Sequence, residues 1–188
     1  MGEIGALFSG LRGKSKIDFS NGNTPFATYS DIYRQPQLHA VTGSVHINAD
    51  ENQTSLCKGD IIFTASSENF EDVGLSSVVT EVPEATCLLN SFCFGLRLHE
   101  PESYDLSYLS HLFRSESVRR QIRRSANGVT RINISKKPFL KTKIPVPELK
   151  EQEKLGAILD KFDALVNDIS SGLPKLLTFP ELKEDEAV

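Results

Sequence analysis

The sequence predicts a mixed α/β (α+β) fold, in which a twisted mixed sheet precedes a long C-terminal amphipathic helix. Over the first half, short apolar runs alternate with turn residues about every eight to twelve positions, a spacing typical of strands. An apolar stripe with helical spacing follows Asp105, and a second one begins near Glu148. With 188 residues the chain can bury a substantial core.

Composition indicates a globular chain in a reducing compartment. No apolar run approaches the ~20 residues that cross a bilayer, and Met1-Gly2-Glu3 does not begin a signal peptide. The three cysteines, Cys57, Cys87 and Cys93, are odd in number and form no C-x-x-C pair, so we expect neither a disulfide framework nor a zinc site. We therefore expect a cytoplasmic protein with no membrane association.

Charge is strongly segregated along the chain, although the net charge is only −4. The segment 114–143 contains ten basic residues and a single acid, Glu116, a balance of +9. One edge of the fold should therefore be positive, as a polyanionic partner requires. The alternative is a solvated helix face whose cations only complement the helix dipole.

Strands are expected at seven places: Ile4–Phe8, Phe26–Tyr29, Val45–Asn48, Ile61–Ala65, Ser77–Thr80, Thr86–Leu89 and Phe92–Leu98. The first strand enters a basic loop with Arg12, Lys14 and Lys16, where small residues allow close approach to phosphates. This loop is not a nucleotide-binding P-loop, because Gly10 to Ser15 is two residues too short for that motif. Ser66–Gly74 is expected as an exposed polar loop.

A helix is expected from its N-cap, Asp105, to about Ser125, and Asn127-Gly128 should end it. Its core-facing stripe comprises Leu109, Leu112, Phe113, Val118 and Ile122. Four arginines fall mostly off this stripe and are expected in solvent: Arg119, Arg120, Arg123 and Arg124.

A final helix is expected to begin near Glu148, after Pro147. The apolar positions step by four, three, four and three residues, the pattern of a coiled-coil seam. About three heptads is marginal for a free helix, so this helix should dock on something. The expected dimerisation residues are Leu155, Ile158, Leu159, Phe162, Leu165, Val166 and Ile169. Residues 172–188 should form a short tail with a disordered acidic end.

Several stretches together resemble the DNA specificity subunit of type I restriction-modification systems. Gly128-Val-Thr-Arg-Ile-Asn-Ile-Ser135 and Ile144-Pro-Val-Pro-Glu-Leu-Lys-Glu-Gln152 are similar to the end of a target recognition domain and the start of its spacer helix. The resemblance continues through Lys136-Lys-Pro-Phe-Leu140, and upstream through Gly59–Phe63 and Asn90-Ser91-Phe92. It implies a DNA target recognition domain over residues 1–146 and a spacer or dimerisation helix over residues 147–171.

The resemblance also implies a function. The chain would be a non-catalytic, cofactor-free specificity protein that binds one half of a bipartite target in double-stranded DNA. It would hold methyltransferase (modification) subunits, and through them the restriction subunit, at that sequence. A full-length subunit of the family has two recognition domains and two spacer helices, so this chain resembles a half-subunit that pairs with itself or with another half-subunit. The spacer helix looks shortened, because Leu173-Pro174 leads directly to Lys175-Leu-Leu-Thr-Phe179.

DNA contacts are expected from polar and basic residues in loops on a rigid sheet. The alternative to DNA contact is a purely structural role, in which Thr130 caps a turn and Arg131 pairs with a carboxylate. The candidates are Arg12, Lys14, Lys16, Ser66, Ser67, Arg120, Arg124, Asn127, Thr130, Arg131 and Lys136.

Two other functions stay open at this point. One is a coiled-coil interaction module without DNA recognition. The other is a metal-dependent nuclease, since Glu148 and Lys150 have E-x-K spacing, but that chemistry needs the pair on a strand beside an aspartate. An adenine methyltransferase signature is absent, and the four histidines, His39, His46, His99 and His111, show no ligand spacing, so no metal is expected.

Overall fold

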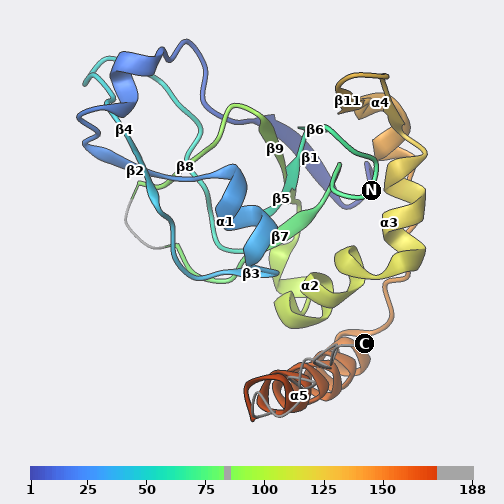
Figure 1. Cartoon of the computed structure of the whole chain (residues 1–188). Helices are drawn as coiled ribbons and strands as arrows, with labels where there is room; N and C mark the ends of the chain where they lie inside the picture. The colour runs from blue at the N-terminus through green and yellow to red at the C-terminus, as the bar shows by residue number, and fades with distance from the viewer. Residues whose placement is uncertain (83–85, 173–188) are drawn as a thin grey trace, which may run out of the picture.

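The computed structural model describes residues 1–82 and 86–172, with only the backbone described for 169–172. Its centre is a five-stranded sheet in the order β1-β9-β5-β7-β3 (Figure 1). All neighbours are antiparallel except β3 and β7, so the predicted mixed sheet is confirmed. The strands are β1 (Gly5–Ser9), β3 (Gln37–Leu38), β5 (Ile61–Thr64), β7 (Ser76–Val79) and β9 (Cys93–Leu98).

Two three-stranded sheets flank the central one, in the orders β4-β2-β8 and β10-β11-β6. The expected strand Phe26–Tyr29 ends early because Thr28 caps helix α1 (Tyr29–Arg34) in a capping box with Asp31. In place of the strand expected at Val45–Asn48, the structure has β4, which ends at Val45. The bounds are β2 (Thr24–Ala27), β4 (Gly43–Val45), β8 (Leu88–Leu89), β6 (Ser66–Ser67), β10 (Ala126–Asn127) and β11 (Ile132–Ile134).

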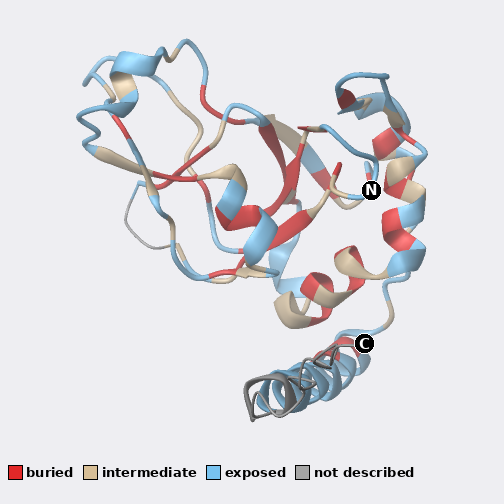
Figure 2. Ribbon diagram, in the orientation of Figure 1, coloured by how far each residue is buried: buried red, intermediate tan, exposed pale blue. Residues whose placement is uncertain are grey.

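An aromatic cluster joins the central sheet to helices. The ring of Phe63 lies 5.3 Å from Phe94, 5.4 Å from Phe113 and 5.0 Å from Phe139. These residues come from β5, β9, α2 (Leu106–Arg114) and α4 (Lys136–Leu140), so the cluster fixes both helices on one face. The opposite face packs on α1, and the buried residues follow the sheet in Figure 2.

The single helix expected from Asp105 to Ser125 is wrong, because α2 stops at Ser115 and α3 (Glu116–Arg123) begins anew. Ser115 is extended, with φ −62° and ψ 144°. Its hydroxyl donates to Leu112 O (2.6 Å) and accepts from Val118 N (3.5 Å), so it closes one helix and caps the next. The predicted N-cap, Asp105, is confirmed, and all five residues of the predicted core stripe are buried.

Three cations of the basic segment serve the fold, and two of them, Arg119 and Arg123, were expected in solvent. Arg119 is buried and donates to Val73 O (3.0 Å) and to Glu71 O, so it holds the 66–74 segment down. Consequently that segment is not a simple exposed loop. Arg114 donates to Ser76 O (2.8 Å) and Ile32 O (2.6 Å), and burial lowers its pKa to about 10. Arg123 pairs with Glu71 and Glu116.

The C-terminal helix α5 (Leu149–Gly172) begins where the sequence predicts. It packs against α2 on the side away from the central sheet (Figure 1). Within the described ranges, no helix is both long and apolar enough to cross a membrane. The expected disordered tail lies outside the described residues.

Candidate functional site

A short hairpin brings together candidate residues that are far apart in sequence. In the hairpin, Asn127 of β10 pairs with Asn133 of β11. On its other side β11 pairs with β6, where Ser66 lies opposite Asn133 and Ser67 opposite Ile132. Ser66 and Ser67 therefore lie beside the hairpin, a proximity that depends on the fold.

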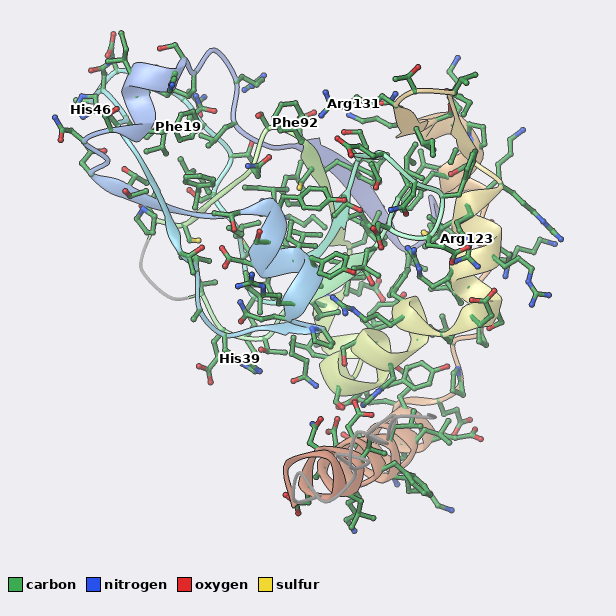
Figure 3. All side chains as sticks on the ribbon, viewed as in Figure 1. Phe19, His39, His46, Phe92, Arg123 and Arg131 are labelled. Carbon is green, nitrogen blue, oxygen red and sulfur yellow. The ribbon has the colours of Figure 1, made fainter. Side chains whose placement is uncertain are left out.

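Arg131 is held in place by an aromatic ring. Its guanidinium lies over the ring of Phe92, 5.0 Å from the centroid, and Phe92 is 52% exposed (Figure 3). Within the described parts of the chain we find no ion pair between Arg131 and a carboxylate, so the structural alternative for this residue is not supported. Beside it is a hollow of about 310 Å³, lined by Tyr29, Ser66, Ser67, Glu68, Asn69, Asp72 and Arg131.

Lys136 and Asn127 extend the same surface. Lys136 Nζ donates to Ser9 Oγ at the end of β1 (3.3 Å), and Asn127 Nδ2 donates to Ser135 Oγ (2.6 Å). Both side chains are exposed, as is Thr130 at the hairpin tip. We call this group the hairpin surface: Ser67, Phe92, Asn127, Thr130, Arg131 and Lys136. The predicted contact residue Ser66 is only 7% exposed and is not part of it.

The first basic loop does not join this surface as a unit. Lys14 Nζ bonds Glu51 Oε1 (2.6 Å) and its side chain is 4% exposed, so it is not a free cation. Arg12 is exposed, and its backbone bonds the amide of Gln53 in both directions. Lys16 is also exposed and opens the short helix η1 (Lys16–Phe19) beside β4.

Arg120 and Arg124 belong to a different part of the molecule. Arg120 projects from α3 with a 65% exposed side chain, 3.7 Å from Glu116. Arg124 closes α3 and lines a separate hollow of about 160 Å³ together with Lys141. These two arginines therefore form a second basic area outside the hairpin surface.

Sequence reasoning missed Phe92 as a site residue because it assigned Phe92 to a strand. The strand begins one residue later, and Asn90 Oδ1 accepts the Phe92 amide (2.8 Å), which turns the ring outward. An aromatic residue directly after an Asn-Ser turn was the available signal. Tyr29 and Asn69 were also missed, and neither carries a sequence signal for this role.

Helix α5 is anchored to the domain by a buried glutamine. Gln152 is 1% exposed; its Nε2 donates to Pro147 O (2.8 Å) and Ser103 O (3.3 Å), and its Oε1 accepts from Asp105 N (3.1 Å). One turn later, a Cβ on Gly156 would lie 2.6 Å from Asp105 Oδ1 and 3.0 Å from Tyr108 N. The helix therefore docks closely through polar and small residues.

A third helical turn adds an acidic contact. Asp160 accepts from Ser107 Oγ (2.7 Å), and its other oxygen lies 2.8 Å from His111 Nε2. Partial burial opposes ionisation of Asp160, but the bonds from Ser107 and His111 outweigh it and lower its pKa.

This lowered pKa predicts that docking of α5 weakens in acid. A carboxyl whose docked pKa is depressed stabilises docking above its undocked pKa, and this contribution is lost as pH falls through the docked pKa. Hydrogen-exchange protection of α5, corrected for intrinsic rates, should fall in that range. Asp160→Asn should remove this part of the pH dependence; an unchanged profile would contradict the assignment.

The apolar stripe of α5 lies on another face. Gln152, Gly156 and Asp160 are centred roughly 120° around the helix from the stripe, at ~100° per residue. Six stripe residues, which we call the seam, are 37–60% exposed: Leu155, Ile158, Leu159, Phe162, Leu165 and Val166. The side chain of the seventh predicted residue, Ile169, lies outside the described part. Among the described residues, docking of α5 on the domain therefore leaves the seam exposed, most fully at Phe162, Leu165 and Val166.

Comparison with known proteins decides the family. Residues 1–178 match the family model of the type I restriction modification DNA specificity domain. The chain belongs to this family. The DNA specificity component of type I restriction-modification systems is itself non-catalytic.

Relatives of this specificity chain are longer proteins. It is 32% identical over 183 residues to the Escherichia coli type I restriction enzyme EcoR124I/EcoR124II specificity subunit, covering 93% of this chain and 43% of that protein. It is 26% identical to a putative Haemophilus influenzae type I restriction enzyme specificity subunit, covering 93% and 42%. The chain therefore spans about two-fifths of these curated relatives.

Solved structures show the same fold. The HsdS subunit of Thermoanaerobacter tengcongensis superposes with a TM-score of 0.63 at 19% identity, covering 93% of this chain and 38% of that one. The S subunit of M. genitalium gives 0.57 at 17% identity, covering 90% and 39%.

The E-x-K pair of this specificity chain does not have the geometry of a nuclease site. Glu148 precedes α5 and Lys150 lies in its first turn, both exposed, rather than on a strand. Across the described ranges, no three metal-ligating side chains gather into a group.

Proposed function

We propose that this specificity chain reads one half of a bipartite target in double-stranded DNA through the hairpin surface. The observation that supports this most is the stacking of Arg131 on the exposed ring of Phe92. An unrestrained arginine loses side-chain entropy when it binds, whereas the ring already restricts this one. A fixed guanidinium can bond O6 and N7 of guanine together, the commonest specific contact in the major groove.

The surroundings of Arg131 have the chemistry that base reading requires. Asn127 and Thr130 present groups for base edges, while Lys136 offers a cation for phosphates. Glu68 in the adjoining hollow could accept from the amino group of cytosine. Because the hairpin is paired to β6, Asn127, Thr130 and Arg131 are carried on a hairpin anchored to a sheet rather than on a free loop.

We further propose that the chain works as a half-subunit. Two copies joined antiparallel through the seam would supply the two recognition domains of a full-length family member, and a symmetric pair would read an interrupted palindrome. Pairing with a different half-subunit would give an asymmetric target. With 24 residues, α5 is about 36 Å long, close to one turn of DNA, which fits half-sites a few base pairs apart.

The partners proposed for the assembled dimer are methyltransferase (modification) subunits and, through them, a restriction subunit. We place this assembly in the cytoplasm. The odd number of cysteines, with no C-x-x-C pair, supports this placement.

Substitution of Arg131 tests the DNA proposal. The full chain would first be used to select preferred sequences from randomised duplex DNA. Arg131→Ala should weaken binding to the selected site by about 5–150-fold, at ~1–3 kcal/mol for one bidentate contact, and relax the preference at one base pair. Arg131→Lys should recover charge but not the base preference.

The matched control is Arg34→Ala, which removes an exposed arginine at the end of α1. It should leave base preference unchanged. Equal losses for Arg34→Ala and Arg131→Ala would indicate nonspecific charge attraction and would contradict the proposal.

A coiled-coil interaction module without DNA recognition is the second candidate, and the uncovered seam favours it. One result would distinguish the two functions. A dimer that stays intact but selects no DNA sequence at low salt would support the interaction module alone.

A further inference from the structure

One apolar side chain stands out beside the hairpin surface. Val129, at the tip between β10 and β11, is 97% exposed. Ile17 in η1 is the nearest comparison, at 83%. An isopropyl group placed fully in water contributes nothing to the packing of the fold, and single exposed apolar side chains are common on protein surfaces. Val129 is informative because of where it stands, at a hairpin tip beside Arg131.

The tip that carries Val129 is not a loose loop. Gly128 has φ +124°, and a Cβ there would lie 2.1 Å from Arg131 O, so the tip closes tightly across that position. Arg131 O also accepts from Asn133 Nδ2 (3.1 Å). With the hairpin further tied by Asn127 to Ser135, Val129 is displayed in a defined position.

Two cations near the tip suit an anionic polymer: Arg131 is two residues from Val129, and Lys136 lies on the hairpin surface. The acids Glu68 and Asp72 line the adjoining hollow, so the positive charge is confined to these two side chains. The major groove of DNA admits a two-stranded ribbon such as this hairpin. Among the base edges exposed there, the one apolar group is the C5 methyl of thymine.

We propose that the hairpin tip enters the major groove and that Val129 contacts the 5-methyl group of a thymine next to the base pair read by Arg131. The inference rests on the proposed function and adds a prediction to it: the half-site contains a thymine at one required position. Burial of one methyl group is worth about fourfold in affinity.

The test uses the full chain and the sequence selected from randomised duplex DNA. Each thymine of that sequence is replaced in turn by uracil, which removes only the methyl group. Wild-type protein should lose about fourfold in affinity at one position. Val129→Ala should bind the thymine duplex about as weakly as wild type binds the uracil duplex, and should not distinguish the two. Ile17→Ala, the matched control, should distinguish them as wild type does.

The outcomes separate this inference from the function on which it rests. Selection of no sequence would defeat the proposed function. Selection of a sequence without a required thymine, or a uracil effect that persists in Val129→Ala, would overturn the inference alone. Val129→Ala could also lose affinity for every duplex equally, while wild type loses none when thymine is replaced by uracil. That result would overturn the inference too, and would indicate that Val129 packs against DNA or protein without reading a base.

Discussion

Phe162→Asp is expected to convert a dimer of this chain into a monomer without unfolding the recognition domain. Phe162 is 60% exposed in the single chain, so a carboxylate there costs the folded monomer little. In a dimer joined through the seam, the same substitution removes a buried ring and places an unpaired charge in an apolar contact. We expect a loss of about 4 kcal/mol, about a thousandfold in the dissociation constant.

Sedimentation velocity across a concentration series would measure the change, with thermal unfolding of the domain recorded alongside. Ala164→Asp is the matched control, because it adds the same carboxylate to an exposed position of α5 off the seam. It should dimerise like the wild type. A wild-type chain that stays monomeric at high concentration, or equal effects of the two substitutions, would defeat dimerisation through the seam.

Gln152→Leu is expected to release α5 from the recognition domain. Leucine fills similar space but cannot bond the groups that Gln152 satisfies, which leaves Asp105 N, Ser103 O and Pro147 O without this partner. Each unmet buried group costs about 1 kcal/mol or more, so docking should lose about 3 kcal/mol. Hydrogen exchange of residues 149–160 should quicken, while the protection of β5 and β9 should persist. The control is Glu153→Leu, at the exposed position that follows Gln152. It should leave both the exchange of residues 149–160 and the protection of β5 and β9 unchanged.

Gly156→Ala is also expected to weaken the docking of α5, in this case by a steric clash rather than by lost hydrogen bonds. In an isolated helix, alanine would stabilise by about 1 kcal/mol relative to glycine. Here its Cβ would collide with Asp105 Oδ1, which caps α2 by accepting from Tyr108 N (2.7 Å) and cannot move without losing that bond. A substitution that raises helix propensity should therefore weaken docking. If Gly156→Ala tightened the contact instead, the packing of α5 on α2 described above would be wrong.

These two anchors matter for function because the orientation of α5 sets the geometry of any dimer. If the helix is free, two recognition domains joined through the seam lose a defined separation. Gln152→Leu should then keep dimerisation and single half-site binding but lose the preference for one spacing between half-sites. Selection from duplexes with variable spacers would detect this loss.

Local sequence patterns were enough to predict several elements of the fold. Apolar runs between turn residues located the central strands β1, β5, β7 and β9, because a buried strand needs several consecutive or alternating apolar residues. Helical spacing identified the buried stripe of α2 and α3 and the start of α5. The same patterns carried the family resemblance, which the comparison with known proteins confirmed.

The contacts between distant polar groups could be seen only in the tertiary structure. The same is true of which basic side chains remain exposed and able to bind a partner. Arg119 falls off the apolar stripe, yet it is buried because the carbonyls of Glu71 and Val73 lie within its reach. Ser115 divided one predicted helix in two, because its hydroxyl satisfies backbone groups on both sides. The stacking of Phe92 and Arg131 and the pairing of β6 with β11 join segments far apart in the chain. Such contacts depend on how distant segments are folded together, and local periodicity holds no information about them.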